Sequence, residues 1–581
     1  MKHGNEQYFI KNSGWITGTL IPFDILKAIF KKYCPWYLNP TPDPVYSKPD
    51  VPPAVPERVF CRLFDEGEQP DAEGLIELGL AMEQEAATVI DFDVRPDIDD
   101  NGDDGDFNDD GKVDVAVTDI REEINRSGDA NIPAGYTYLG QFIDHDITRS
   151  DFSRSGFGTP TADGTVNPED IINRRTPALD LDCLYGNGPV EQPELFEADG
   201  VHMRVGTNSA TPDGAPGGPI PGDFPNDLPR TPDKKAVIGD SRNDENLAVA
   251  QTHLAFIKFH NKIVDRIAAE TGLSGSALFD AARKEVVLHY QSLILHDFLP
   301  RLVQADVLAD VLQHGRRFYT DEFKDCMPIE FSVAAYRLGH SMVRPVYEWN
   351  KVFNSNPSNV PATMELLFEF SEVSGSRAEG DDPFFGSPNV PANWIIDWTR
   401  FYDFSNVDGV ETHPQLNFAR EIDSKLSFAL RTLPEFQKRN LPDVFISLAT
   451  RNLLRGRLVK LPSGQAVAKA MQQKGIEVEP IRPRRIARSP HKKILRKYNF
   501  QKETPLWYYI LREAKVVNDG NRLGPVGSRI VAEVFVGLIE HSKISILKEA
   551  SDLKYSMPEL LAFVGDLNPL GPDVSREPVA V

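Results

Sequence analysis

The sequence predicts a mainly α-helical fold, built as one large domain with little β-structure. Apolar residues recur three and four positions apart through long stretches, most clearly over 135–149, 247–272 and 276–297, and this is the period of an amphipathic helix. Alternation of apolar and polar residues, which is typical of a half-buried strand, is rare. Hydrophobic residues make up 41% and aromatic residues 9% of the 581 residues, which is enough for a sizeable core.

Composition excludes several classes of protein. The formal net charge of −23 at pH 7 argues against a nucleic-acid-binding protein and favours one that stays dispersed in solution. No apolar run reaches the roughly eighteen residues of a membrane span, so no transmembrane segment is expected. The N-terminus lacks the continuous apolar segment of a signal peptide.

The cysteines are scattered along the chain, at Cys34, Cys61, Cys183 and Cys326. Their spacing matches neither a CxxC metal pattern nor a dense disulfide framework, which favours a reducing compartment. Together with the absence of a recognisable signal peptide, this predicts a cytoplasmic protein, or one secreted by a route that needs no leader.

Residues 1–58 are predicted to form an arm in front of a main domain that spans 59–581. Residues 22–38 place apolar side chains at helical spacing with three lysines between them. A membrane-surface helix is one interpretation, but the thin cationic face favours an arm docked on the main body. The proline-rich stretch that follows predicts an extended spacer.

Residues 97–114, DIDDNGDDGDFNDDGKVD, are the most biased segment of the chain. From Asp106 the spacing follows the DxNxDG pattern of a calcium loop. Position twelve of that pattern is Val117, however, where a bidentate carboxylate should stand. A weak calcium site and a solvated acidic loop therefore both remain open for this insertion.

The stretch GYTYLGQFIDHDITR, residues 135–149, combines an apolar helix with several polar groups. Because a helix advances about 100° per residue, Gln141, Asp144 and His145 share a face, and Asp146 points to the side of them. Burying such groups without partners is costly, so they need partners or a function. A core histidine flanked by solvated acids is the alternative interpretation.

A second polar stretch, RRTPALDLDCLYG, begins at residue 174. Thr176, Asp180 and Asp182 alternate around Ala178, so a hydroxyl, a carbonyl and two carboxylates could surround a hard cation. An ordinary turn between helices is the alternative.

Residues 329–345 predict one buried helix that carries Arg337 and His340. A histidine inside such a helix must be hydrogen-bonded or bound to a metal. His253 and His260, on the helix predicted after residue 247, are expected to be packing or surface histidines.

Residues 443–465 predict a helix that carries Asn452 and Arg455 and ends at Gly456. The strongly basic residues 482–497 are interpreted as a solvated loop or hinge, and a surface for an anionic partner is the less favoured interpretation.

Five motifs occur in an order that resembles the animal-type haem peroxidases: YLGQFIDHDIT, RRTPALDLDCLYG, GDSRNDEN, AYRLGH and RNLLRG. The resemblance extends over roughly residues 60–580 and is closest to the microbial members. Any one of these motifs would be weak evidence, but five in order are strong. The resemblance implies a large helical fold that binds haem b, and an enzyme that uses hydrogen peroxide to oxidise a small reducing substrate.

The resemblance also implies roles for individual residues around the haem. His145, with Gln141 beside it, and Arg242 lie on the distal side. On the proximal side, His340 binds the iron and Asn452 accepts the other ring N–H of that histidine. An imidazole can pass a proton from peroxide to the leaving oxygen, a guanidinium can stabilise the negative charge that develops, and haem iron takes one neutral imidazole.

Three further sets of residues receive a role from the resemblance. Arg337 and Arg455 lie near the haem propionates. Asp144 and Glu245 form ester links to haem methyl carbons. The calcium ligands are Asp146, Thr176, the Ala178 carbonyl, Asp180 and Asp182. Because Asp146 follows His145 directly, a calcium ion bound there would fix the helix that carries the distal base.

The chain departs from the family pattern at two places, and no role is carried over from the family there. Some members have a methionine that forms a third haem link, and this chain has Asn246 at that position, which excludes such a link. The family's common RDHGLP becomes RLVKLP over 457–462, so no role is carried over to that segment. The family also provides no role for the acidic residues 97–114.

Two other functions compete with the peroxidase. One is a fatty-acid dioxygenase of the cyclooxygenase side of the superfamily, and the other is an inactive, calcium-stabilised binding module. Related dioxygenases carry a radical tyrosine three residues before the proximal histidine, where this chain has Arg337. Tyr336 lies four residues before His340. Because one residue along a helix is a rotation of about 100°, Tyr336 should point away from where the radical tyrosine has to lie. The reducing substrate and the oligomeric state stay open.

Overall fold

The computed structural model describes residues 58–83, 129–150, 164–356, 359–372, 386–431 and 446–573, with Phe384, Leu433 and the backbone of two short strands near the N-terminus. These strands, β1 (Phe9–Lys11) and β2 (Gly14–Ile16), pair in antiparallel fashion. The helix expected at 22–38, the proline-rich spacer and the acidic residues 97–114 lie outside the described residues. Their interpretations, and the division at residue 58, stay predictions.

The prediction of a mainly α-helical fold is confirmed. The longer helices are α2 (Ala72–Met82), α4 (Gly135–Ile147), α7 (Leu247–Thr271), α8 (Gly275–Leu293), α10 (Ala305–His314), α15 (Leu448–Leu458), α16 (Gly464–Gln473), α19 (Leu506–Asn518) and α20 (Pro525–His541). The shorter helices are α6 (Asp182–Tyr185), α9 (Leu299–Leu302), α11 (Gly339–Met342), α12 (Met364–Glu369), α17 (Pro483–Ile486), α18 (Lys492–Lys497), α21 (Ile546–Glu549) and α22 (Met557–Val564). None of the helices in the described ranges combines the length and the apolar character needed to cross a membrane.

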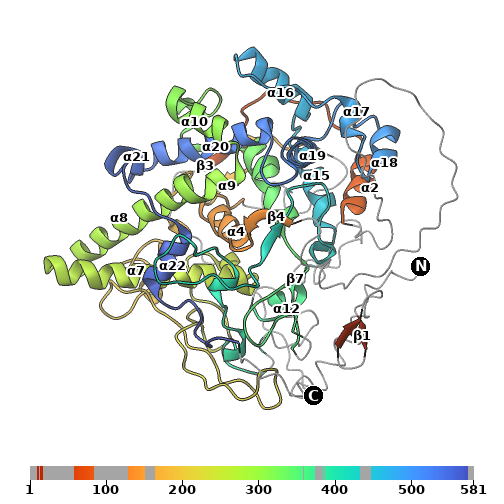
Figure 1. Ribbon diagram of the computed structural model, residues 1–581. Helices are drawn as coiled ribbons and strands as arrows, with labels where there is room; N and C mark the ends of the chain where they lie inside the picture. The colour runs from red at the N-terminus through yellow and green to blue at the C-terminus, as the bar shows by residue number, and fades with distance from the viewer. Residues whose placement is uncertain are drawn as a thin grey trace.

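Helix α4 lies near the middle of the body, with α7 and α8 on one side and α15 and α19 on the other (Figure 1). Its apolar face is fully buried, with Leu139, Phe142 and Ile143 at 0% exposure. Phe142 stacks on Phe256 of α7, with ring centroids 4.7 Å apart. Burying a side chain of this size contributes about 1.5–3 kcal/mol, so packing from several directions fixes the helix that carries His145.

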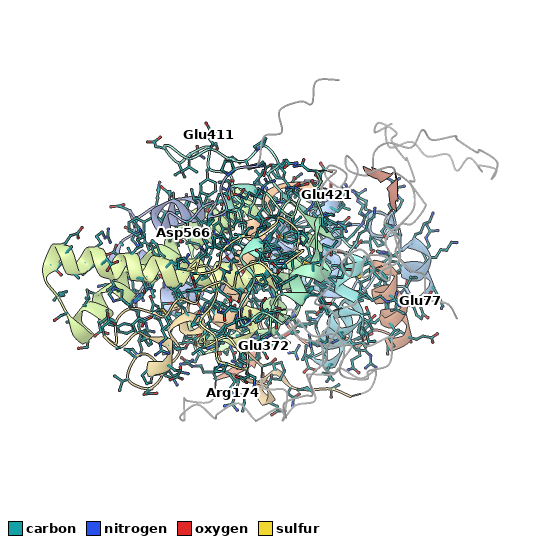
Figure 2. The ribbon with its side chains drawn as sticks, turned by 90° about the horizontal axis from the view of Figure 1, so that it is seen from below. Glu77, Arg174, Glu372, Glu411, Glu421 and Asp566 are labelled. Atoms are coloured by element: carbon teal, nitrogen blue, oxygen red, sulfur yellow. A yellow bond between two sulfur atoms is a disulfide. The ribbon has the colours of Figure 1, made fainter. Side chains whose placement is uncertain are left out.

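Long-range ion pairs at the periphery join elements that are distant in sequence. Glu77 of α2, labelled at the edge of the body in Figure 2, accepts hydrogen bonds from Lys497 Nζ at 2.7 Å and from the Tyr498 hydroxyl at 3.0 Å. Residues 482–497, predicted as a loop or hinge, instead contain the short helices α17 and α18. Their basic side chains are mostly exposed, as predicted.

The β-structure of the main body consists of short pairings. Strand β3 (Arg58–Cys61) lies between β5 (Ile172–Asn173), which is antiparallel to it, and β6 (Cys326–Pro328), which is parallel. The other strands form two pairs, β4 (Asp129–Pro133) with β9 (Phe418–Arg420) and β7 (Val346–Tyr347) with β8 (Ala362–Thr363).

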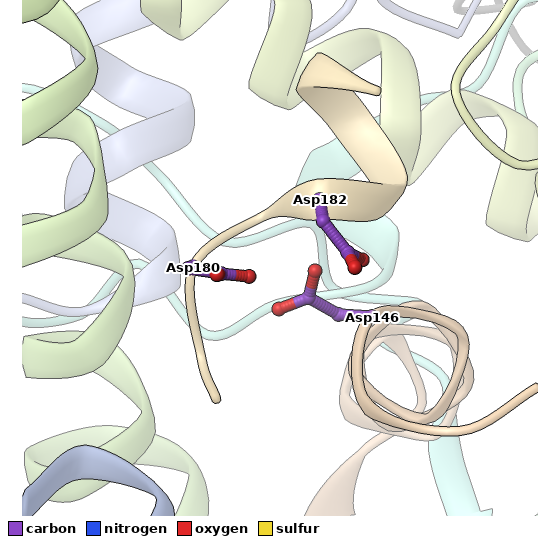
Figure 3. Close-up of side chains that lie close together, drawn as sticks. All are labelled: Asp146, Asp180 and Asp182. Atoms are coloured by element: carbon purple, nitrogen blue, oxygen red, sulfur yellow. The ribbon is translucent and has the colours of Figure 1, made fainter. Parts of the chain in front are cut away.

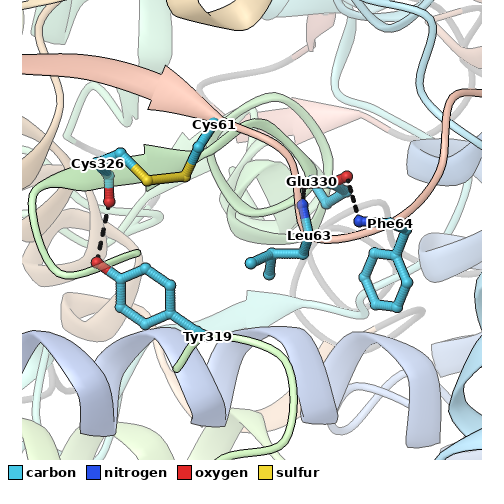
Figure 4. Close-up of a disulfide and its surroundings, with 6 residues drawn as sticks. All are labelled: Cys61, Leu63, Phe64, Tyr319, Cys326 and Glu330. Atoms are coloured by element: carbon cyan, nitrogen blue, oxygen red, sulfur yellow. Dashed lines mark hydrogen bonds between the residues drawn. A yellow bond between two sulfur atoms is a disulfide. The ribbon is translucent and has the colours of Figure 1, made fainter. Parts of the chain in front are cut away.

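A disulfide joins Cys61 of β3 to Cys326 of β6 (Figure 4). Just beyond it, the Glu330 carboxylate accepts the N–H groups of Leu63 at 3.1 Å and Phe64 at 3.2 Å. These contacts tie the start of the domain to the chain that leads to His340. The pairing counts against the predicted reducing compartment, because disulfides persist in oxidising ones. The two cysteines are 265 positions apart in sequence, so their spacing gave no indication of the pair.

Two helix predictions are wrong in detail. The single helix expected over 329–345 is divided into a π-helical turn (Glu330–Ala334), a 3₁₀ turn (Ala335–Leu338) and α11. One reason is that the Ser332 carbonyl accepts a hydrogen bond from Arg337 Nε at 2.9 Å. This side chain competes for the carbonyl with the main-chain N–H groups of the following turn. Gly456 does not end the helix over 448–458, because α15 continues to Leu458.

Candidate functional site

The distal residues predicted on α4 come together with the turn that precedes α7. His145 is buried, and its Nε2 lies 4.0 Å from Glu245 Oε2. Gln141 donates to the same Glu245 oxygen at 3.1 Å and accepts from Asn246 Nδ2 at 3.1 Å. The predicted common face of Gln141 and His145 is therefore confirmed. Asp144 is half-buried and accepts a hydrogen bond from the Thr148 hydroxyl at 3.0 Å.

Arg242 closes the C-terminal end of α4. It stands in a 3₁₀ turn (Ser241–Asp244), and its Nη2 donates to the carbonyls of His145 at 3.1 Å and Thr148 at 2.7 Å. The carboxylate of Asp240 binds Arg242 Nε at 3.1 Å and Nη2 at 2.8 Å. Arg242 Nη1 makes no hydrogen bond with any described residue, so this donor is available to a bound anion.

Electrostatics around this arginine keep the distal histidine neutral. Burial and the positive charge of Arg242 lower the pKa of His145 to about 3. Burial opposes the charge on Asp240, but the guanidinium groups of Arg242 and Arg175 hold its pKa well below the usual range. The imidazole can therefore accept a proton at neutral pH, beside a permanent positive charge.

On the proximal side, His340 is held by one amide. Its Nδ1 lies 2.8 Å from Asn452 Nδ2 on α15, 112 residues further along the chain. The amide oxygen of Asn452 has no hydrogen-bond partner in the described part of the structure. An amide turned by 180° would place that oxygen against a His340 Nδ1–H, which is the arrangement predicted for an iron ligand.

The other nitrogen of His340 is not bonded to the described part of the protein. Within the described residues, Nε2 has no hydrogen-bond partner, and a Cβ built on the neighbouring Gly339 would meet no atom within 4 Å. Burial, followed by the charges of Arg337, Arg455 and Arg451, holds the pKa of His340 well below its usual value. A neutral imidazole with one nitrogen held and the other free fits a haem iron ligand.

The two predicted propionate arginines are both close to this histidine. Arg455 is buried on α15, and Arg337 is half-buried in the 3₁₀ turn. The charge of Asp144 on α4 also acts on Arg337, whose pKa burial lowers. Helix α4 packs against α11, so the distal and proximal residues lie on neighbouring elements.

Three aspartates gather beside the distal helix, as predicted for the calcium site (Figure 3). One carboxylate oxygen from each of Asp146, Asp180 and Asp182 lies within 4.8 Å of the others. Thr176 donates to Asp182 Oδ2 from its N–H at 3.1 Å and its hydroxyl at 3.0 Å. Ala178 is buried in the same loop, and the role of its carbonyl stays a prediction.

The donor set of this cluster fits a hard divalent cation. Burial and the charges of its two neighbours raise the pKa of Asp146 well above its usual value, and burial followed by Asp182 raises that of Asp180 to about 7. Asp180 Oδ1 and Asp182 Oδ1 are buried and lack hydrogen-bond partners among the described residues. A cation would satisfy these oxygens and remove the repulsion.

Sequence reasoning missed several residues of the distal side. Asp240 and Arg175 form a charge network that joins Arg242 to the aspartate cluster, because Arg175 also lies 3.4 Å from Asp182 Oδ1. Asn243 and His253 are buried and bonded to each other at 2.9 Å. Asp240 and Asn243 lie in the polar stretch GDSRNDEN and Arg175 in RRTPALDLDCLYG, but no pattern in the sequence indicated how these residues pair.

Comparison with known proteins identifies the class. A family model described as animal haem peroxidase matches residues 131–540, which is more than half of the chain. The chain belongs to the animal haem peroxidase family. Members of this family generally bind haem and act as oxidoreductases on hydrogen peroxide and a reducing substrate.

Individual relatives match parts of the chain. It is 28% identical over 202 residues to Dual oxidase 1 of Caenorhabditis elegans, covering 34% of this chain and 13% of that protein. It is 26% identical over 230 residues to thyroid peroxidase of Homo sapiens, covering 38% of this chain and 24% of that protein. The matched regions are thus less than two thirds of these relatives' own length.

One solved structure shares the fold over almost its whole length. Peroxidase A from Dictyostelium discoideum superposes with a TM-score of 0.54 at 15% sequence identity, and the match covers 90% of this chain and 96% of that one. The helical architecture is therefore that of an animal-type peroxidase.

Proposed function

We propose that this chain is a haem-dependent peroxidase that reduces hydrogen peroxide and oxidises halide, thiocyanate or small aromatic donors. The observation that carries the proposal is the pairing of two differently held histidines, a buried neutral His145 beside Arg242 and a His340 with a free Nε2. His340 would hold haem b through Nε2, and Arg337 and Arg455 would bind its propionates. Bound haem supplies the iron that takes peroxide and passes on the electrons of the donor.

The distal residues would handle the proton and the charge. His145 Nε2 takes a proton from hydrogen peroxide and returns it to the departing oxygen, which leaves as water. Arg242 stabilises the negative charge on that oxygen while the O–O bond breaks. Gln141, bonded to Glu245 and Asn246, holds this side in place.

Two further roles rest on the same arrangement. Asp144 and Glu245 would form ester links to haem, and the cluster of Asp146, Asp180, Asp182 and Thr176 would bind calcium as structural support for α4. Asn246 is engaged by Gln141 and caps α7 through the N–H of Val249 at 3.0 Å. It therefore has a structural task at the position where some relatives carry a third link.

The fatty-acid dioxygenase remains the second candidate, and one contact bears on it. The Tyr336 hydroxyl donates to the Gly140 carbonyl of α4 at 3.1 Å, and its ring stacks on Phe331 at 4.8 Å. Tyr336 thus reaches α4 from irregular turns and not from the regular helix that the prediction assumed, and its orientation relative to haem stays a prediction. Its hydroxyl is nevertheless already bonded to the main chain within an aromatic cluster, which favours the peroxidase.

Absorption spectra and two assays test this proposal. The native spectrum, repeated after acid–acetone extraction, shows whether haem is present and whether it is covalent. We expect fast peroxide-dependent oxidation of iodide, thiocyanate or a phenol, little oxygen uptake with linoleate, and no change in either from Tyr336→Phe. Oxygen uptake with a fatty acid that Tyr336→Phe abolishes would establish the dioxygenase, and a protein that takes up no haem would be the inactive binding module.

A further inference from the structure

A single amide joins two buried histidines on the distal side. Asn243 Oδ1 lies 2.8 Å from His145 Nδ1, and Asn243 Nδ2 lies 2.9 Å from His253 Nδ1. The three residues come from α4, from the turn before α7 and from α7 itself. Asn243 and His253 have no exposed surface, and His145 is 5% exposed. Water therefore has little access to these bonds.

The chemistry of an amide links the protons on the two rings. An amide oxygen only accepts and an amide nitrogen only donates hydrogen bonds. With Oδ1 against His145, the proton of that ring must be on Nδ1. With Nδ2 against His253, the Nδ1 of that ring must carry a lone pair, so its proton is on Nε2. Turning the amide by 180° reverses both tautomers together.

Only one of these two states leaves His145 able to act as a base. When Nδ1 carries the proton, His145 Nε2 has a free lone pair on the side of Glu245. In the reversed state Nε2 carries the proton and has none to accept. The mechanism proposed above therefore requires the amide orientation in which Oδ1 faces His145.

His253 is the second partner of the amide, and the orientation with Oδ1 on His145 places the His253 proton on Nε2. Its Nε2 is buried and has no hydrogen-bond partner among the described residues, and its ring packs edge-to-face against Phe142. Nδ1 is thus the only ring nitrogen of His253 with a polar partner. His260, on the same helix, differs because both of its nitrogens are bonded, to the Tyr185 hydroxyl at 3.0 Å and to the Val201 carbonyl at 2.9 Å.

We propose that Asn243 and His253 are positioning residues for His145: the amide couples the tautomers of the two rings, and its orientation with Oδ1 toward His145 leaves His145 Nε2 free to accept a proton. This proposal rests on the proposed peroxidase function, in which His145 is the base. It replaces the prediction that His253 is a packing or surface histidine.

Nitrogen NMR of ¹⁵N-histidine-labelled protein reads the tautomer directly. The diamagnetic carbon monoxide complex of the reduced, haem-loaded protein is used, and the His145 signals are assigned by their loss in His145→Gln. We expect a protonated Nδ1 and an unprotonated Nε2 in the unmodified protein. Asn243→Asp, which offers only acceptor oxygens, should preserve this state, whereas Asn243→Leu and His253→Phe should give mixed or reversed tautomers.

Peroxide reactivity provides the second measurement. Asn243→Leu and His253→Phe should slow the reaction with hydrogen peroxide by about 10–100-fold, by analogy with the range found when hydrogen-bond partners of metal ligands are removed, and Asn243→Asp should retain most of the rate. His260→Phe is the matched control, because it removes a buried histidine from α7 without touching Asn243. Melting temperatures of all variants show whether each one folds.

The outcomes separate this inference from the proposed function. An unchanged His145 tautomer in both folded variants, Asn243→Leu and His253→Phe, would overturn the inference even if the protein is a good peroxidase. If the His145 tautomer changes in both variants but the protein has no peroxidase activity, the coupling through Asn243 is supported and the proposed peroxidase function is rejected. If either variant fails to fold, the isosteric Asn243→Asp decides: a His145 Nε2–H in that protein contradicts the inference.

Discussion

The two imidazoles of the site, on His145 and His340, are held in different ways. His145 stands on a regular helix, and its ring is bonded to Asn243, whose second partner is His253. His340 stands where a π-helical turn, a 3₁₀ turn and a four-residue helix follow one another, and one amide holds its ring. Under the proposed function, the first arrangement would orient a proton acceptor, and the second would present one free nitrogen to the iron.

The charges around the two rings differ as well. Both pKa values lie below the usual one because of burial, but the positive groups near His145 are compensated by Asp240. Around His340 the groups that act are Arg337, Arg455 and Arg451. Burial and the positive surroundings of His340 keep its imidazole neutral, while Asp240 near His145 forms an ion pair with Arg242.

The largest effect should come from removing the proximal imidazole. His340→Ala should abolish most haem binding or all turnover, because the described structure offers no second histidine with a free nitrogen next to Asn452. Haem titration followed by absorption spectroscopy measures this. His314→Ala, which removes an exposed histidine, is the control, and a normal spectrum with full activity in His340→Ala would refute the proximal assignment.

Removing the distal groups should slow the reaction but leave haem bound. His145→Ala should lower the rate of reaction with peroxide by about 10²–10⁴-fold, the usual contribution of a general acid–base. Arg242→Ala should cost about 10²–10³-fold, as for other donors that stabilise a developing anion. Stopped-flow mixing with peroxide measures both rates. Unchanged rates, or loss of haem from either variant, would contradict the assignment of His145 and Arg242 to the reaction with peroxide and of His340 to haem binding.

The carboxylates Asp144 and Glu245 should decide whether haem can be extracted. After the protein has turned over some peroxide, haem should resist acid–acetone extraction, and Asp144→Asn combined with Glu245→Gln should release all of it. Extraction followed by mass spectrometry gives the bound fraction. Complete extraction from the unmodified, peroxide-treated protein would show that the two carboxylates stay unlinked.

The smallest effect should come from the aspartate cluster, which acts on the distal side through α4. A calcium chelator, or Asp146→Ala, should lower the melting temperature, because a ligand that binds only the folded state stabilises it by about 2.7 kcal/mol at a hundredfold excess over Kd. The peroxide rate should fall while haem uptake by His340 persists. A melting temperature that ignores the chelator, in protein shown by mass spectrometry to hold no ion, would argue against the site.

Local pattern was sufficient for the parts of this protein that depend on near neighbours in sequence. The helical period placed Gln141 and His145 on one face of α4, and the structure brings Asp180 and Asp182 together as their spacing predicted, while their role as cation ligands stays a prediction. The helical period also predicted α7 and α8 closely, because their apolar faces repeat over many residues. The order of the motifs led to the family resemblance, which the family match at residues 131–540 confirms.

Tertiary structure alone decided the contacts that join distant segments. Nothing local pairs Cys61 with Cys326 or Asn243 with both of its histidines. The pairing of Asn452 with His340 was expected only from the family resemblance, not from any pattern within either segment. The bonds from the Leu63 and Phe64 N–H groups to the Glu330 carboxylate also join segments that are far apart in sequence. Such contacts depend on which surfaces pack together, and periodicity within a single segment carries no information about them.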